Sequence, residues 1–204
     1  MKGMKKVFIY AFSLLFLVPA NSSEVNPQTF IDINAQSMVQ IIVNNQDLFE
    51  SDPDLFKKKI KDIFEPMVDF RRVSASVMGK DNYLKSSTEQ RLEFIEVFKN
   101  SLLDTYASTL AQWGDQKVVT NFTNKTTFKK IEDVNQDLLT DSDSYPITYK
   151  VRKSDEGWKI INIIVNGVNL GLTFRNQFRA LAEEFDGDID KVILNWTSDA
   201  NLPE

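Results

Sequence analysis

The side chains that most often carry out chemistry in proteins are missing from this chain. Its 204 residues include no histidine and no cysteine. Histidine is the usual general base near neutral pH and the commonest metal ligand, and cysteine supplies thiolate nucleophiles, disulfides and many zinc sites. Their absence removes most hydrolase and zinc-enzyme hypotheses, and without disulfides the fold must rest on its core. We expect a protein that is not an enzyme and uses no cofactor.

The aspartates do not supply a metal site in place of histidine and cysteine, because their spacing does not fit a calcium loop. Asp186–Asp190 begins like the loop of an EF-hand, which needs glycine at its sixth position and glutamate at its twelfth. Those positions hold Lys191 and Thr197, and the pair Asp141 and Asp143 fails at the same two points. We therefore expect no metal site.

Asp69 is the carboxylate with the most apolar neighbours, and Arg71 and Arg72 follow it. Burial could raise its pKa and make it an acid or base, but a structural partner, either an arginine or a backbone amide, is the simpler interpretation. The two arginines could lie at the mouth of a pocket or simply in solvent. The run Lys57–Lys61 could attract acidic groups, although a solvated helix face is the more common outcome.

The first 22 residues have the features of a secretory signal peptide. Three lysines in residues 1–6 precede an almost unbroken apolar run from Val7 to Val18, and a proline and small residues follow. An uncleaved membrane anchor would need about 20 apolar residues, and this run is shorter. We expect cleavage near Ser22, no lipid anchor because the lipoprotein cysteine is missing, and a soluble periplasmic protein in which residues 23–204 form a single domain.

The charge of the chain argues against nucleic acid as a partner. Its net charge is −5, and cleavage would remove three lysines. Phosphates repel an acidic protein, as do anionic membrane surfaces. We therefore expect no binding of nucleic acid and only brief encounters with membranes.

Residues 26–113 carry the signals of helices. Prolines that follow N-cap residues begin the first two, at positions 27 and 53. Pro66 is expected to open a third helix that ends at Gly79. Ser87 and Gln90 stand three apart, as in a capping box, and an amphipathic helix follows them.

Residues 114–204 carry the signals of strands and then of two closing helices. The expected antiparallel strands are Lys117–Phe122, Phe128–Val134, Ile147–Arg152 and Trp158–Val165. The last strand is apolar on both faces apart from Asn162, so both faces should be covered. The chain also holds 15 phenylalanines, which either a filled core or a cavity for an apolar ligand would explain; composition alone favours the filled core.

Ten segments follow one another in an order and at a spacing that can be compared with a known family. They are Phe64–Ser74, Val77–Gly79, Tyr83, Thr88–Arg91, Phe94, Phe98, Tyr106–Leu110, Gly157–Ile160, Val165–Leu170 and Phe174–Phe178. From about Pro27 to Trp196 the chain resembles the MlaC, or toluene-tolerance, family of periplasmic phospholipid-binding proteins. Asn162 and Asn166 stand where that family usually has aspartate or glutamate, and Asn169 replaces a common serine.

The resemblance implies a fold, a ligand and partners. The fold would be α+β, with a twisted antiparallel sheet of about four strands, NTF2-like, wrapped by helices. A pocket between sheet and helices would hold the acyl chains of a phospholipid as cargo, with the headgroup outside. The protein would exchange lipid with an outer-membrane MlaA-type lipoprotein complex and an inner-membrane ABC transporter with an MlaD-type component, and so maintain the lipid asymmetry of the outer membrane.

Motif position and apolar character together select the pocket residues. The expected lining is Phe70, Val73, Val77, Tyr83, Phe94, Phe98, Ile161, Ile163, Val165, Val168 and Leu170. A competing hypothesis is an exported interaction module or chaperone whose apolar face binds protein and whose core is full. An NTF2-like hydrolase is disfavoured because no histidine is present to act as a base.

Overall fold

The computed structural model describes residues 25–198, and the predicted signal peptide lies outside them. It confirms the expected α+β fold, with helices in the first half and an antiparallel sheet that begins at Lys117. Within the described residues, no helix is long and apolar enough to cross a membrane.

Five helices precede the sheet in the described part of the chain. They are α1 (Pro27–Val43), α2 (Gln46–Ser51), α3 (Pro53–Met67), α4 (Phe70–Lys85) and α5 (Thr88–Ala111). The side chains of Asn26 and Asp52 cap α1 and α3 by accepting backbone N–H hydrogen bonds of the first turn. The capping box of Ser87 and Gln90 is present at the start of α5.

The prediction of a helix from Pro66 to Gly79 is wrong at both ends. Pro66 lies in the last turn of α3, and Asp69 is the N-cap of α4, where its Oδ1 accepts a 3.1 Å hydrogen bond from the N–H of Arg72. Gly79 has φ 74° and ψ 163°, a conformation that is almost restricted to glycine, so it kinks α4 instead of ending it. Beyond the kink the helix continues to Lys85, because its far half still packs in the helical core.

The sheet has five strands in sequential order, all antiparallel, and two helices follow it. The strands are β1 (Lys117–Thr120), β2 (Ile131–Leu139), β3 (Ser144–Ser154), β4 (Gly157–Val165) and β5 (Val168–Asn169), and the helices are α6 (Leu170–Glu184) and α7 (Ile189–Leu194). The four predicted strands are present with shifted ends. The short fifth strand arises at a two-residue turn, in which Asn166 and Gly167 both have positive φ angles.

A β-bulge at Ile161 changes which side chains of β4 face the helices. Ile160 pairs with Val151 and Asn162 pairs with Lys150, which leaves Ile161 as an extra residue. The bulge breaks the two-residue alternation, and Ile160 and Ile163 consequently line the same internal space. The bulge therefore decides which apolar side chains of β4 face the helices.

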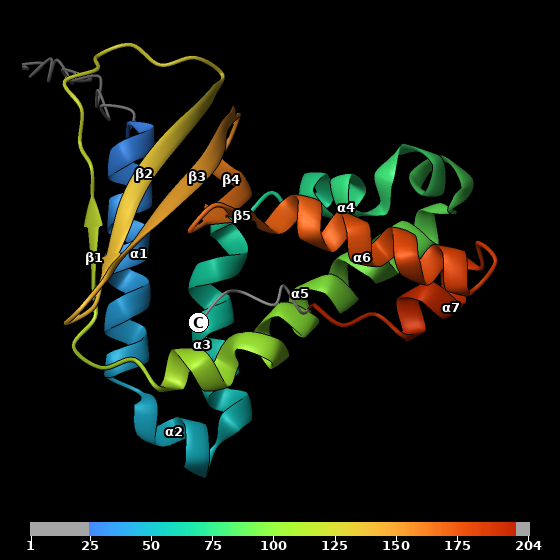
Figure 1. The fold of residues 1–204 in the computed structure, drawn as a ribbon, viewed down its shortest axis with the longest axis horizontal. Helices are drawn as coiled ribbons and strands as arrows, with labels where there is room; N and C mark the ends of the chain where they lie inside the picture. Colours follow the sequence, from blue (N-terminus) through green and yellow to red (C-terminus); the bar gives the residue numbers. More distant parts are fainter. Residues whose placement is uncertain (1–24, 199–204) are drawn as a thin grey trace, which may run out of the picture.

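In the arrangement shown in Figure 1, α1 packs against β1 and β2, and α3, α4 and α6 pack against β4, while α5 and α7 pack mainly on other helices. Three clusters of buried side chains result. One lies among α4, α5, α6 and α7, a second lies between the sheet and α1 with the end of α3, and a third joins α1, α3 and α5. The space where these clusters meet is where a cavity can form.

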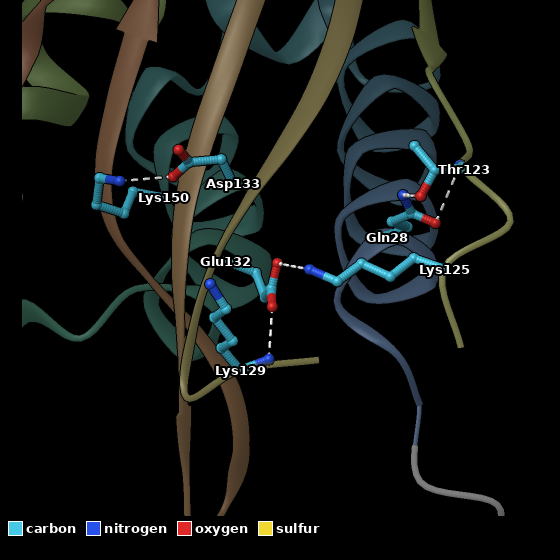
Figure 2. Close-up of polar contacts among 7 residues, drawn as sticks. All are labelled: Gln28, Thr123, Lys125, Lys129, Glu132, Asp133 and Lys150. Atoms are coloured by element: carbon cyan, nitrogen blue, oxygen red, sulfur yellow. Dashed lines mark hydrogen bonds and ion pairs between the residues drawn. The ribbon is translucent and has the colours of Figure 1, made fainter. Parts of the chain in front are cut away.

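Polar contacts hold the long connection between β1 and β2 (Figure 2). Gln28 of α1 donates a 2.8 Å hydrogen bond to the hydroxyl of Thr123 and accepts one from its N–H. Glu132 accepts hydrogen bonds from Lys125 Nζ and from the N–H of Lys129. Burial by itself would raise the pKa of Glu132, but these two donors outweigh it, so the pKa lies below its ordinary value.

Candidate functional site

A cavity of about 280 Å³ lies where the three buried clusters meet. Phe98 and Phe174 come from the helical cluster, Ile160 from the sheet cluster, and Ile60 and Leu103 from the third. Side chains from α1, α3, α4, α5, β4 and α6 complete the wall, and nearly all are apolar. Well-packed interiors contain few voids larger than a water molecule, so an apolar space of this size is suited to a ligand.

A second cavity of about 200 Å³ lies between α1 and the sheet. It shares Met38, Phe64, Leu110, Ile160 and Ile163 with the first, so the two spaces adjoin. Together they form an internal apolar space that runs from the inner face of the sheet towards α6. Pockets for organic ligands are commonly apolar spaces of roughly 300–1,000 Å³, and the adjoining cavities are of this kind.

Tyr149 lines the second cavity. Burial raises its pKa to about 12, because a phenolate would lose its hydration there. The group therefore stays neutral near pH 7, and the cavity wall carries no charge at this position.

Five of the eleven predicted pocket residues line the first cavity. They are Phe70 and Val73 of α4, Phe98 of α5, Ile163 of β4, and Leu170 at the start of α6. Four different elements therefore bring these side chains together. That these five side chains contact a ligand stays a prediction.

The other six predicted residues do not line this cavity. Val77 and Phe94 are fully buried in the cluster among α4, α5, α6 and α7, where they fill the core. Val165 and Val168 pair across the turn between β4 and β5 and line neither cavity.

Tyr83 and Ile161 line a separate surface groove beside the cavity. The bulge is responsible for the position of Ile161, since it turns this residue away from Ile160 and Ile163. A single sequence shows an apolar strand but not the residue at which its alternation breaks.

Much of the cavity wall was recognised in the sequence only as apolar helix faces. Met38, Phe64, Leu102, Leu110 and Phe174 all follow helical spacing, and all line the first cavity. Helical spacing predicts which face is buried. It does not tell whether that face meets another side chain or an open space, so no sequence signal could have separated these residues from ordinary core.

The surface groove is rich in positive charge. It measures about 850 Å³ and is lined by five basic residues and one acidic residue, Asp69. The basic residues are Arg71, Arg72, Lys80, Lys150 and Arg175. Val73, Asn162 and Gly171 line both the groove and the first cavity, so these two spaces meet at α4, β4 and the start of α6.

Asn162 ties together the backbone at this junction. Its Nδ2 donates a 3.0 Å hydrogen bond to Asn169 Oδ1, and its Oδ1 accepts a 3.0 Å hydrogen bond from the N–H of Gly171. An ionised aspartate could accept but not donate, so asparagine suits the double role. A Cβ at position 171 would lie 2.5 Å from Asn162 Oδ1, so the close approach requires glycine.

Acidic side chains do not gather at a metal site within residues 25–198. Asp188, from the calcium-like segment, instead caps α7 by accepting a hydrogen bond from the N–H of Lys191. That backbone hydrogen bond lowers the pKa of Asp188.

An apolar cavity beside a cationic groove is the arrangement that an amphiphilic molecule requires, and the fold and site place this chain in the class of small-ligand-binding proteins. A family model described as "MlaC protein" matches residues 33–198. The chain belongs to the MlaC family.

Individual relatives match along most of the chain. The toluene tolerance protein ttg2D of Pseudomonas putida is 27% identical over 193 residues, which cover 95% of this chain and 87% of that protein. The intermembrane phospholipid transport system binding protein MlaC of Haemophilus influenzae is 24% identical over 208 residues, which cover 98% and 95%.

A solved structure has the same fold. It is a phospholipid-binding protein from Ralstonia solanacearum, determined in complex with a phospholipid. The TM-score is 0.76 at 22% identity, and the match covers 83% of this chain and 94% of that chain. At this identity the comparison establishes a common architecture.

Proposed function

We propose that this protein is a periplasmic carrier that holds the acyl chains of a phospholipid in its two adjoining cavities. The observation that carries the proposal is the first cavity itself, an internal space of about 280 Å³ with a nearly continuous apolar wall. The MlaC-family relative of Haemophilus influenzae is described as a phospholipid transport binding protein, which supports the same ligand class. An interaction module with a filled core would have no need of such a space.

The tails would contact the part of the wall that several elements build together. Phe70, Val73, Phe98, Ile163 and Leu170 are the predicted residues best placed for this role, because all five line the first cavity. A ligand in the second cavity would lie against the inner face of β3 and β4. The remaining predicted residues would support the wall from behind or lie at its edges.

Carriage of this kind needs no chemical step. Burying about 30 methylenes from water at roughly 0.8 kcal/mol each would release about 24 kcal/mol, more than the practical ceiling of about 18–21 kcal/mol. A lipid leaves a bilayer in which its tails are already dry, so the net difference between bilayer and cavity is small. The protein would lower the barrier to crossing water, and a partner would set the direction. A catalytic role is no part of the proposal.

The family and the predicted signal peptide support a cellular role. The protein would shuttle phospholipid between an outer-membrane MlaA-type complex and an inner-membrane ABC transporter with an MlaD-type component, and so maintain outer-membrane lipid asymmetry. The name of the Haemophilus influenzae relative, an intermembrane phospholipid transport protein, supports this role. The predicted cleavage near Ser22 would release the carrier into the periplasm.

Native mass spectrometry of freshly purified protein tests the proposal directly. We expect a bound diacyl phospholipid at a ratio near one per chain, identified after extraction. Protein that is purified empty and takes up no lipid from phospholipid vesicles would favour the interaction module instead.

A further inference from the structure

We propose that the basic groove beside the cavity binds the phosphodiester of the phospholipid, through Arg71 and Lys80 of α4 and Arg175 of α6. This inference rests on the proposed function, because it assigns a place to the headgroup of the lipid whose tails occupy the cavity. It also predicts a preference: a lipid with a phosphate is held better than one with the same tails and no phosphate.

The unpaired charges of the groove point to an anionic ligand. Two of the five cations have acidic partners: Arg72 Nε lies 3.5 Å from Asp69 Oδ2, and Lys150 Nζ lies 2.6 Å from Asp133 Oδ1. Within residues 25–198, no acidic side chain forms an ion pair with Arg71, Lys80 or Arg175. Three cations that share one groove repel one another, so an anion placed among them relieves that repulsion.

The lack of an ion pair does not by itself distinguish the groove, since Lys59, Lys85 and Lys117 also form none among the described residues. In the lysine run of α3, Lys57 pairs with Asp54 and Asp104, and Lys58 pairs with Asp62. These exposed ion pairs on the surface of α3 favour the interpretation of the lysine run as a solvated helix face. The groove differs because five cations, from α4, β3 and α6, line one concave surface.

The position of the groove matches the shape of a phospholipid. The cavity and the groove meet at Val73, Asn162 and Gly171. A molecule with tails in the cavity would pass this junction and bring its head among the cations. The guanidinium of Arg175 lies near Gly79 at the kink of α4, where an added Cβ would meet Arg175 Nε at 3.5 Å. Arginine stays charged at any physiological pH and can donate two parallel hydrogen bonds to a phosphate.

The test is a competition between two lipids that differ only in the headgroup. Lipid-free protein is incubated with vesicles of dioleoylphosphatidylglycerol that also contain dioleoylglycerol, and native mass spectrometry measures the ratio of the two bound lipids. Because both lipids come from the same vesicles, attraction of the protein to the membrane surface cancels in this ratio. We expect Arg175→Gln to lower the phospholipid share by up to about fivefold, the upper end of the range for an ion pair open to solvent.

Arg179→Gln is the matched control. Arg179 lies one turn further along α6, outside the groove, and its Nε lies 3.8 Å from Glu183 Oε1. The substitution removes the same charge as Arg175→Gln. We expect it to leave the ratio unchanged. Arg71→Gln, on the other helix, should repeat the effect of Arg175→Gln, and circular dichroism checks that each variant is folded.

Each outcome decides the proposal. A ratio that does not change in Arg71→Gln and Arg175→Gln overturns the groove assignment and leaves the carrier function intact. Loss of both lipids in these variants also overturns it, because the arginines would then support the fold. Wild-type protein that binds neither lipid defeats the carrier function as well.

Inorganic phosphate separates a headgroup site from a site for a free anion. If added phosphate lowers uptake of dioleoylphosphatidylglycerol and not of dioleoylglycerol, the groove binds the headgroup as proposed. If phosphate binds to the wild-type protein and leaves the lipid ratio unchanged, the groove serves a free anion and the proposal fails.

Discussion

Replacement of Ile163 by glutamate separates a lipid cavity from an ordinary core. Ile163 lines both cavities, so the new carboxylate would lie among acyl chains whenever lipid is bound. An ionised carboxylate without a partner is costly in such a dry place. In lipid-free protein, water could enter the same space and hydrate it.

The expected loss of affinity can be worked out from protonation. The bound lipid would force the carboxyl group to stay neutral, and holding a glutamate protonated at about pH 7 against a usual pKa of about 4.3 costs about 3.7 kcal/mol, or roughly 500-fold in affinity. The folded protein loses much less, about 1–2 kcal/mol for the partly buried isoleucine. A domain with about 5–15 kcal/mol of stability remains folded after that loss.

Ile164→Glu is the control, because the next residue of β4 faces the other way. Ile164 pairs with Thr148, whose hydroxyl donates to Asn135 on the exposed face of the sheet. The assays are lipid content by mass spectrometry and thermal unfolding by circular dichroism. We expect Ile163→Glu to lose lipid and stay folded, and Ile164→Glu to keep lipid.

The pH dependence gives the sharpest check. The pKa of Glu at position 163 would be raised in the lipid complex, so lipid binding should return as the pH falls towards about 4.3 and should be lost as the pH rises. An Ile163→Glu variant that unfolds would show that Ile163 is core. A variant that keeps its lipid at neutral pH would show that the cavity does not hold the tails.

Two further predictions concern the framework around the site. Gly79→Ala should lower the free energy of unfolding in urea by about 2 kcal/mol, because φ is 74° there and ψ is 163°; a neutral effect would contradict the strained kink. Glu132 has a lowered pKa, so its contribution to stability is present above the ordinary carboxyl pKa and is lost as the pH falls below about 4. Hydrogen exchange should show protection of the Lys129 N–H falling over that range, and Glu132→Gln should remove this pH dependence; equal behaviour of the two proteins would refute the link.

Local signals predicted most of the secondary structure, because caps and turns are short-range features. The side-chain caps at Asn26, Asp52 and Ser87 all form as expected. Pro66 and Gly79 misled the prediction because each can either end a helix or lie within an irregular part of one. The choice depends on packing against distant elements, which a single sequence does not contain.

The pocket was only partly predictable for a similar reason. Phe98 and Phe94 both lie on the apolar face of α5, yet Phe98 lines the cavity and Phe94 fills the core beside Trp196. Both environments exclude water, so both select the same residue type. Only the distance between facing elements distinguishes a filled space from an open one.

The amino-acid sequence by itself determined the chemical limits of this protein, its order of helices and strands, and its family resemblance, because these depend on residue types and short spacings. The tertiary structure decided where a cavity forms between the elements and which basic side chains lack an acidic partner. The bulge at Ile161 selects the side chains of β4 that face the cavity, and the distribution of acidic partners leaves Arg71 and Arg175 without an ion pair among the described residues. Both results depend on contacts between residues far apart in the chain, and such contacts exist only once the elements have packed.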